Sequence, residues 1–142
     1  MNQKIFVNLP VKNIEKTRAF FTSLGYSFNP QFSNDDALCM VISEHIFAML
    51  LAEPFFQTFT RKPVADATKG TEVLVCLSCD SRAEVDALVA KAVAAGGKTP
   101  NAPVDHGFMY GHGFEDLDGH LWELMYMDMA AAAQAHGASA QA

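Results

Sequence analysis

The sequence has no run of basic residues and no long apolar segment, and each absence excludes a class of partner. Lys and Arg total 10 against 16 Asp and Glu, which gives a net charge of −6. Sequence-independent binding of nucleic acid needs clustered Lys and Arg, so we expect no nucleic-acid partner. The apolar run that follows Lys4 is far too short for a membrane span or a signal sequence. We therefore expect no membrane partner and a cytoplasmic location.

Cysteine is also scarce, and the familiar catalytic motifs are missing. The three cysteines are Cys39, Cys76 and Cys79. Cys76 and Cys79 have CxxC spacing, but they lie in a strand pattern, where positions three apart face opposite sides of a sheet. We interpret all three as reduced core thiols. No glycine-rich phosphate loop, GxSxG elbow or HExxH motif occurs.

Half of the 142 residues are hydrophobic, which suits one compact domain or two small modules that share a core. The first half opens with a strand pattern at residues 5–11. Asn13 then marks the start of a helix that runs to about Leu24, and Gly25 ends it. Three strand candidates follow at about 26–32, 37–42 and 46–51.

The second half repeats this order. A strand pattern at residues 73–79 precedes a capping box at residues 81–84, which starts a helix that Gly96 and Gly97 end. A short strand near 97–99, a strand at about 106–115 and a strand at 121–128 complete the half. Each half therefore reads β-α-β-β-β, an internal repeat.

These patterns predict an α+β protein with a single domain at residues 1–128. The two βαβββ modules occupy about 1–52 and 71–128, and a connector spans residues 53–70. An Ala-rich tail, either a frayed helix or disordered, takes up residues 129–142.

The stretch Asp116 to Leu124, DLDGHLWEL, combines a tight turn with an apolar strand that carries one carboxylate. Gly119 stands where such a turn needs a positive φ. A charged Glu123 between apolar neighbours is costly to bury unless a partner, a metal or a ligand compensates it. Glu123 is therefore the leading candidate for a functional residue.

The module order, the DxDGxxWEL motif and the opening LPVKNIEKTRAFF resemble the vicinal oxygen chelate superfamily of glyoxalase I, bleomycin-resistance and extradiol-dioxygenase proteins. The resemblance implies strands that curve into a cup-shaped mixed sheet, assembly as a homodimer and, in metal enzymes, four ligands from the first and last strands of each module. Aligned with each other, the two halves place Phe6, Ala48, Leu74 and Glu123 at those positions. Three of these cannot bind a metal, so we expect no metal cofactor.

A four-residue loop from Asp116 to Gly119 would place His112 directly opposite Glu123, and Tyr110 opposite Met125. Tyr110, His112 and Glu123 would then project together into the cup. The His112–Glu123 pair could be catalytic, could bind a ligand or could be purely structural. On the first strand, Asn8 shares a face with Phe6 and could orient a ligand or bond a neighbouring loop.

The sequence thus predicts a glyoxalase-like or bleomycin-resistance-like protein that binds a small organic molecule in an apolar cup. The predicted ligand-binding residues are Phe6, Asn8, Ala48, Leu74, Tyr110, His112 and Glu123, and His112 and Glu123 are also the candidate catalytic residues. One alternative is a metal-dependent lactoylglutathione-lyase-like isomerase or extradiol dioxygenase with Zn, Ni or Fe held by Glu123, His112 and His106. A second alternative is a non-catalytic structural or partner-binding dimer.

Overall fold

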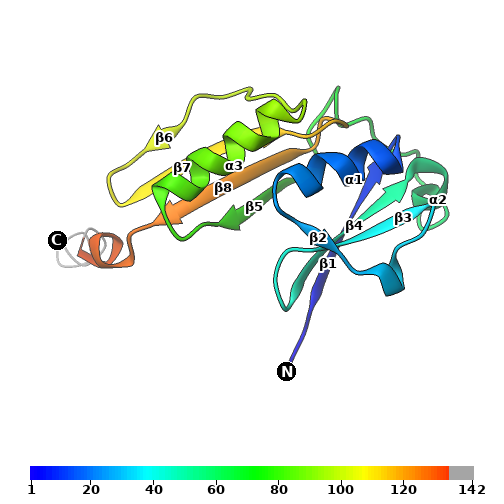
Figure 1. The fold of residues 1–142 in the computed structure, drawn as a ribbon, viewed down its shortest axis with the longest axis horizontal. Helices are drawn as coiled ribbons and strands as arrows, with labels where there is room; N and C mark the ends of the chain where they lie inside the picture. The colour runs from blue at the N-terminus through cyan, green and yellow to red at the C-terminus, as the bar shows by residue number, and fades with distance from the viewer. Residues whose placement is uncertain (135–142) are drawn as a thin grey trace. The chain divides into compact units, whose positions relative to one another are not determined.

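A computed structural model describes residues 1–134 of the chain (Figure 1). The chain divides into two compact units, the first from Met1 to Gly70 and the second from Thr71 onward. Each unit contains one four-stranded mixed sheet and follows the order β-α-β-β-β. The α+β fold class and the repeated βαβββ module are therefore confirmed.

The first unit forms a sheet with the strand order β1-β4-β3-β2, in which β1 and β4 are parallel. Its elements are β1 (Ile5–Val11), α1 (Ile14–Ser23), β2 (Ser27–Phe28), a 3-10 turn at Pro30–Phe32, β3 (Ala37–Val41), β4 (Ile46–Ala52) and α2 (Glu53–Gln57).

The ends of α1 follow the local signals in the sequence. The side chain of Asn13 accepts a hydrogen bond from the backbone N–H of Lys16 at 2.9 Å, which caps the first turn. Gly25 adopts a φ of 100° just after the helix, a conformation that favours glycine. Phe20 and Phe21 are buried beneath the helix, and α1 contacts β3 and β4.

The second unit repeats this topology with the strand order β5-β8-β7-β6, and β5 and β8 are again parallel. Its elements are β5 (Leu74–Ser78), α3 (Arg82–Ala94), β6 (Val104–Asp105), β7 (Met109–Glu115) and β8 (Leu121–Met127). Figure 1 shows α3 lying along β7 and β8.

The helix α3 begins where the capping box predicts. The Ser81 hydroxyl accepts from the backbone N–H of Glu84 at 3.0 Å. Glu84 in turn accepts from the N–H of Asp80 at 2.8 Å, one residue before the position that the capping box prescribes. One N–H group of the first helical turn, that of Glu84, and the N–H group of Asp80 just before the cap thus both have side-chain acceptors, and these bonds fix the start of α3.

One expectation about a single element is wrong, and the structure adds detail to two others. The strand expected near 97–99 is only a bridge between Lys98 and Glu115, and β7 pairs instead with β6. The connector at 53–70 contains α2, which contacts β1 and β4. In the Ala-rich tail, residues 129–134 are helical, and the rest of the predicted tail lies outside the described residues.

None of the helices within residues 1–134 has both the length and the apolar character needed to span a membrane.

Candidate ligand-binding site

A cavity of about 410 Å³ lies in the second unit, on the face of the sheet opposite α3. Side chains of successive strand residues point to opposite faces of the sheet, so the residues of each strand form two alternating sets, one on each face. The set that faces α3 is buried and contains Phe114, Trp122 and Leu124. The other set, which includes Glu123 and Met125, faces the cavity. We call this second side the open face of the sheet.

Two glycines form the floor of the cavity. Gly111 and Gly113 alternate on the open face of β7 and pair with Met125 and Glu123 of β8. A Cβ at Gly113 would lie 2.8 Å from the Trp122 carbonyl oxygen, too close for any side chain without a backbone shift. A Cβ at Gly111 would meet the Leu124 carbonyl oxygen at 3.5 Å, an ordinary contact. The strand backbone is therefore bare where a bound molecule would rest.

Glu123 projects into this cavity and is exposed. Its neighbour across the parallel pair is Cys76, which is also exposed and lines the cavity. Desolvation, and then the negative charge of Glu123, raise the pKa of the Cys76 thiol above its ordinary value. At neutral pH Cys76 is therefore a neutral thiol beside a carboxylate. The expectation that Glu123 is buried and needs a compensating partner is wrong.

The expected pairing of His112 with Glu123 is also wrong. The strands pair Glu115 with Leu121, so the loop between them contains five residues instead of four. This difference of one residue places Glu123 opposite Gly113 and His112 opposite Leu124. Because a shift of one residue moves side chains to the other face, His112 and Glu123 point to opposite sides of the sheet. The backbone of β7 separates the predicted pair.

His112 instead contacts the segment that forms one wall of the cavity. Its Nε2 lies 3.1 Å from the carbonyl oxygen of Asn101. Asn101, Pro100 and Val104 all line the cavity and belong to the chain between α3 and β7. His112 therefore holds the wall in place and remains a lining residue of the site, although not as a partner of Glu123.

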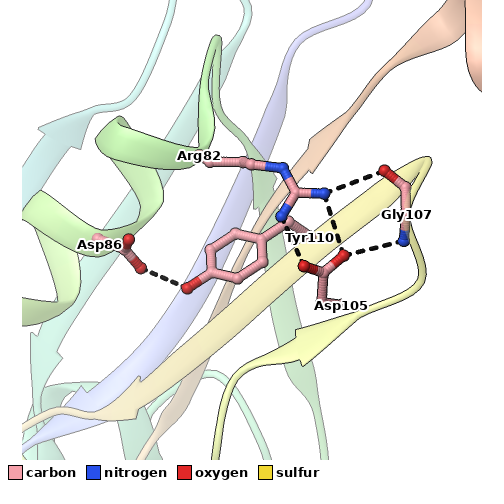
Figure 2. Close-up of polar contacts among 5 residues, drawn as sticks. All are labelled: Arg82, Asp86, Asp105, Gly107 and Tyr110. Carbon is pink, nitrogen blue, oxygen red and sulfur yellow. Dashed lines mark hydrogen bonds and ion pairs between the residues drawn. The ribbon is translucent and has the colours of Figure 1, made fainter.

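Tyr110 also lies on the α3 side, contrary to expectation. Its hydroxyl donates a 2.5 Å hydrogen bond to Asp86 of α3, and this bond raises the pKa of Tyr110 (Figure 2). The Arg82 guanidinium lies 5.0 Å from the centre of the Tyr110 ring. Tyr110 therefore joins the sheet to its helix and does not reach the open face.

Arg82 extends this contact to the wall of the cavity. It donates two hydrogen bonds to Asp105, at 2.7 and 3.0 Å, and one to the Gly107 carbonyl oxygen at 3.0 Å (Figure 2). The bonds from Arg82, and then the one from the Gly107 N–H, lower the pKa of Asp105 to about 2. The network attaches the β6–β7 hairpin to α3, and Val104 in that hairpin lines the cavity.

The motif that drew attention to Glu123 also contains a structural residue that sequence reasoning missed. Asp116 is buried, and its Oδ1 accepts from the backbone N–H groups of Asp118 and His120 at 2.9 and 3.0 Å. Its Oδ2 accepts from the Trp122 indole N–H at 3.0 Å. Burial raises the pKa of Asp116, against the opposing effects of the His120 charge and of these bonds. The DxDGxxW spacing could have indicated this bond network.

In the first unit, Phe6 and Asn8 lie on the same face of β1, as expected. The Phe6 ring stacks on Phe47 at 4.8 Å. The Asn8 amide donates to the Phe6 carbonyl oxygen at 3.1 Å, so it bonds its own strand instead of a neighbouring loop. Ala48 follows Phe47 and therefore faces the other way, where it is fully buried. The position expected for Ala48 is wrong.

The positions of the two helix caps explain why Ala48 does not correspond to Glu123. Asn13 and Ser81 occupy equivalent places, and the same offset matches Phe6 with Leu74 and Asn8 with Cys76. The register then matches Met49, the partner of Asn8, with Glu123. Ala48 corresponds to Trp122 instead. In the last strands, the residue equivalent to Glu123 is therefore one position after the expected Ala48.

The residues at these positions do not fit a metal centre of four ligands. With the last strand realigned, the four positions are Phe6, Met49, Leu74 and Glu123, of which Phe6 and Leu74 have no donor atom and Met49 has only a thioether. Cys76, the neighbour of Glu123, does not replace the missing ligands, because its raised pKa opposes formation of the thiolate that binds metals. Within residues 1–134, no three His, Cys, Asp or Glu side chains are grouped so as to hold a metal ion.

The model of the glyoxalase/bleomycin resistance protein/dioxygenase superfamily matches residues 5–124, which is most of the chain. The chain belongs to this superfamily. The match includes both modules and ends one residue after Glu123. It confirms the resemblance inferred from the DxDGxxWEL motif.

Solved structures support the same fold. The hypothetical protein SA1046 from S. aureus is 30% identical, with a TM-score of 0.74 over 89% of this chain and 95% of that one. A superfamily enzyme from Burkholderia phytofirmans PsJN is 18% identical, with a TM-score of 0.71 over 86% and 96%. The fosfomycin resistance protein FosX from Listeria monocytogenes is 19% identical, with a TM-score of 0.63 over 89% and 93%. No curated protein matches the chain.

Proposed function

We propose that this superfamily member binds a small organic molecule in the cavity of its second unit, without the four-ligand metal. The observation that carries the proposal is the cavity itself. Its volume of about 410 Å³ falls within the range of roughly 300–1,000 Å³ that is typical of small-molecule sites. The lining combines apolar side chains such as Leu74 and Met109 with few polar groups.

The residues of the site would contribute to ligand binding in three different ways. The bare backbone at Gly111 and Gly113 allows a ligand to approach the sheet closely. Apolar side chains would remove the body of the ligand from water, which favours binding in proportion to the apolar area buried. Glu123 would accept hydrogen bonds from the ligand and orient it.

The names of the superfamily and its relatives suggest the first ligands to test. We would titrate the protein by calorimetry with metal-free bleomycin, fosfomycin, the hemithioacetal of methylglyoxal and glutathione, and catechol. The variant Gly111→Leu serves as the cavity-blocking control, because its side chain would extend from the floor into the cavity. Gly70→Leu is the matched control, since a Cβ at Gly70 meets nothing within 4 Å and Gly70 lies outside the cavity.

We expect at least one compound to bind the natural protein and Gly70→Leu, and to lose binding in Gly111→Leu. Binding that survives in Gly111→Leu would place the ligand elsewhere. Absence of binding for the whole panel would contradict the proposal for these ligand classes.

The assembly of the chain is a separate proposal. We infer a homodimer from the superfamily resemblance, and the exposed apolar side chains Ile5 and Phe6 on β1 support a surface that contacts a partner. Sedimentation velocity at several protein concentrations tests it. A single monomeric species at all concentrations would refute the dimer without affecting the proposed ligand site.

A further inference from the structure

We propose that the cavity selects its ligand by charge and shape, and takes a flat organic cation such as an amidinium or guanidinium compound. This inference rests on the proposed function and names the ligand class of the same site.

The charge of the cavity supports this ligand class. Among the residues of the second unit that line it, Glu123 alone carries a carboxylate, and none is a Lys or Arg. The nearby cation Arg82 is already bonded to Asp105 and Gly107 on the α3 side. An anionic ligand would therefore meet a negative charge with no cation in the lining to offset it, whereas a cation would meet a favourable partner.

The Glu123 carboxylate can still accept hydrogen bonds. Within residues 1–134, no hydrogen bond or ion pair engages it. A carboxylate has two oxygen atoms that match the paired N–H groups of an amidinium or guanidinium. The neighbouring Cys76 stays protonated at neutral pH because its pKa is raised, so the site has a single negative charge.

The shape of the floor favours a flat molecule. Two successive open-face positions of β7, Gly111 and Gly113, have no side chain, and the second cannot accept one without a backbone shift. A planar ring can lie on this bare strand beside Glu123, the cross-strand partner of Gly113. Met109 and Met125 also line the cavity, and their flexible, polarisable side chains make favourable contacts with ring edges.

A series of probes of equal size tests charge and shape separately. Benzamidine, benzamide and benzoate share a planar ring and differ in charge, and cyclohexanecarboxamidine retains the amidinium on a puckered ring. Binding would be followed in the full-length protein by the ¹H–¹⁵N NMR signals of Gly111 and Gly113. We expect benzamidine to bind best, benzamide more weakly and benzoate most weakly, with cyclohexanecarboxamidine weaker than benzamidine.

The variant Glu123→Gln keeps the size of the side chain and removes its charge. We expect it to weaken benzamidine about fivefold, the scale of a partly exposed ion pair, and to leave benzamide unchanged. Glu115→Gln is the matched control, because Glu115 lies on the same face of β7 but does not line the cavity. It should change benzamidine binding less than Glu123→Gln does.

The outcomes separate the two proposals. Equal binding of benzamidine and benzoate, or a preference for benzamidine that survives in Glu123→Gln, overturns charge selection and leaves the small-molecule site intact. Equal binding of the two amidines overturns selection for flat molecules. If none of the four probes shifts the glycine signals but a compound of the calorimetric panel binds in the cavity, only this inference fails; if neither set binds there, the proposed function fails with it.

Discussion

The two units have the same scaffold but differ on the open face of their sheets. Their helices begin at equivalent capping residues, Asn13 and Ser81, and in both the first and last strands are parallel. At equivalent positions, however, the first unit has Asn8 beside Met49, and the second has Cys76 beside Glu123. The second unit also has two glycines in β7, whereas β3 of the first unit has none.

This difference shows how a repeated fold can carry different residues on the open faces of its two halves. Strand pairing and helix packing require only the alternation of buried residues, which both units retain. The open face is free to vary, and only in the second unit does it combine bare backbone with a carboxylate. Four predictions test this contrast, from the largest expected effect to the smallest.

Trp122→Ala gives the second unit the residue that Ala48 provides at the equivalent place in the first. Trp122 is 1% exposed and its indole bonds Asp116, so the change creates a cavity and leaves a buried carboxylate oxygen without its partner. We expect the free energy of unfolding to fall by about 3–5 kcal/mol. Urea unfolding followed by circular dichroism measures it, and a loss below about 1 kcal/mol would mean that the two positions tolerate exchange.

Asp116→Asn tests the turn between β7 and β8, whose backbone N–H groups bond the Asp116 side chain. An amide retains one acceptor oxygen but places an NH₂ group either at the Oδ2 position, which accepts from the buried Trp122 indole, or at the Oδ1 position, which accepts from the backbone. We expect unfolding free energy to fall by about 1–3 kcal/mol. The near-ultraviolet circular dichroism of the single tryptophan should change as well; an unchanged spectrum and stability would contradict the role assigned to Asp116.

Gly113→Ala and Gly111→Ala test the floor of the cavity as a matched pair. The added Cβ at 113 meets a backbone oxygen at 2.8 Å, and the one at 111 meets a backbone oxygen at 3.5 Å. We expect Gly113→Ala to lower the free energy of unfolding by about 1–3 kcal/mol, the usual effect of overpacking. Gly111→Ala should change it by less than about 0.5 kcal/mol. Equal effects in urea unfolding would show that close approach at Gly113 is not important.

Asp105→Asn tests the attachment of the β6–β7 hairpin through its pH dependence. The folded-state pKa of Asp105 is lowered to about 2 from an ordinary value of 3.8. A lowered pKa means that the carboxylate contributes stability above about pH 4, and that this contribution is lost as the pH falls through about 2. The variant should have a lower Tm than the natural protein at pH 7.

The Tm difference between Asp105→Asn and the natural protein should begin to narrow below about pH 4, because the Asp105 carboxyl of the unfolded chain takes up its proton there while that of the folded protein stays ionised. Thermal unfolding from pH 7 down to pH 3 measures the trend. Glu15→Gln in the first unit is a suitable control, because the Glu15–Arg18 contact at 3.6 Å is a single exposed ion pair within α1. At pH 7 the Tm of Glu15→Gln should differ from that of the natural protein by less than the Tm of Asp105→Asn does. A Tm difference for Asp105→Asn that is constant with pH would contradict the assignment.

Features that depend on near neighbours were predictable from the sequence. The caps at Asn13 and Ser81 and the positive φ of Gly25 and Gly119 follow from interactions within about four residues. The repeated βαβββ order follows from hydrophobic alternation and helix spacing. The superfamily followed from a motif whose residues lie within one turn and one strand.

The face on which each candidate residue lies was not predictable in the same way. Placing His112 beside Glu123 required the length of the loop from Asp116 to His120, and an error of one residue reversed the side. The loop has five residues because the buried Asp116 carboxylate binds the N–H groups of Asp118 and His120 and holds the turn open to that length. No periodic pattern in the sequence specifies that network.

The sequence by itself therefore determined the repeated βαβββ order, the two helix caps and the superfamily, since each depends on local propensity or on a short motif. Only the tertiary structure decided the neighbours of Glu123, which are Gly113 and Cys76 and not His112. The register of the strands sets which residues are cross-strand neighbours. That register depends on hydrogen bonds between strands that are distant in the chain and on the side-chain bonds that set the length of the connecting turn.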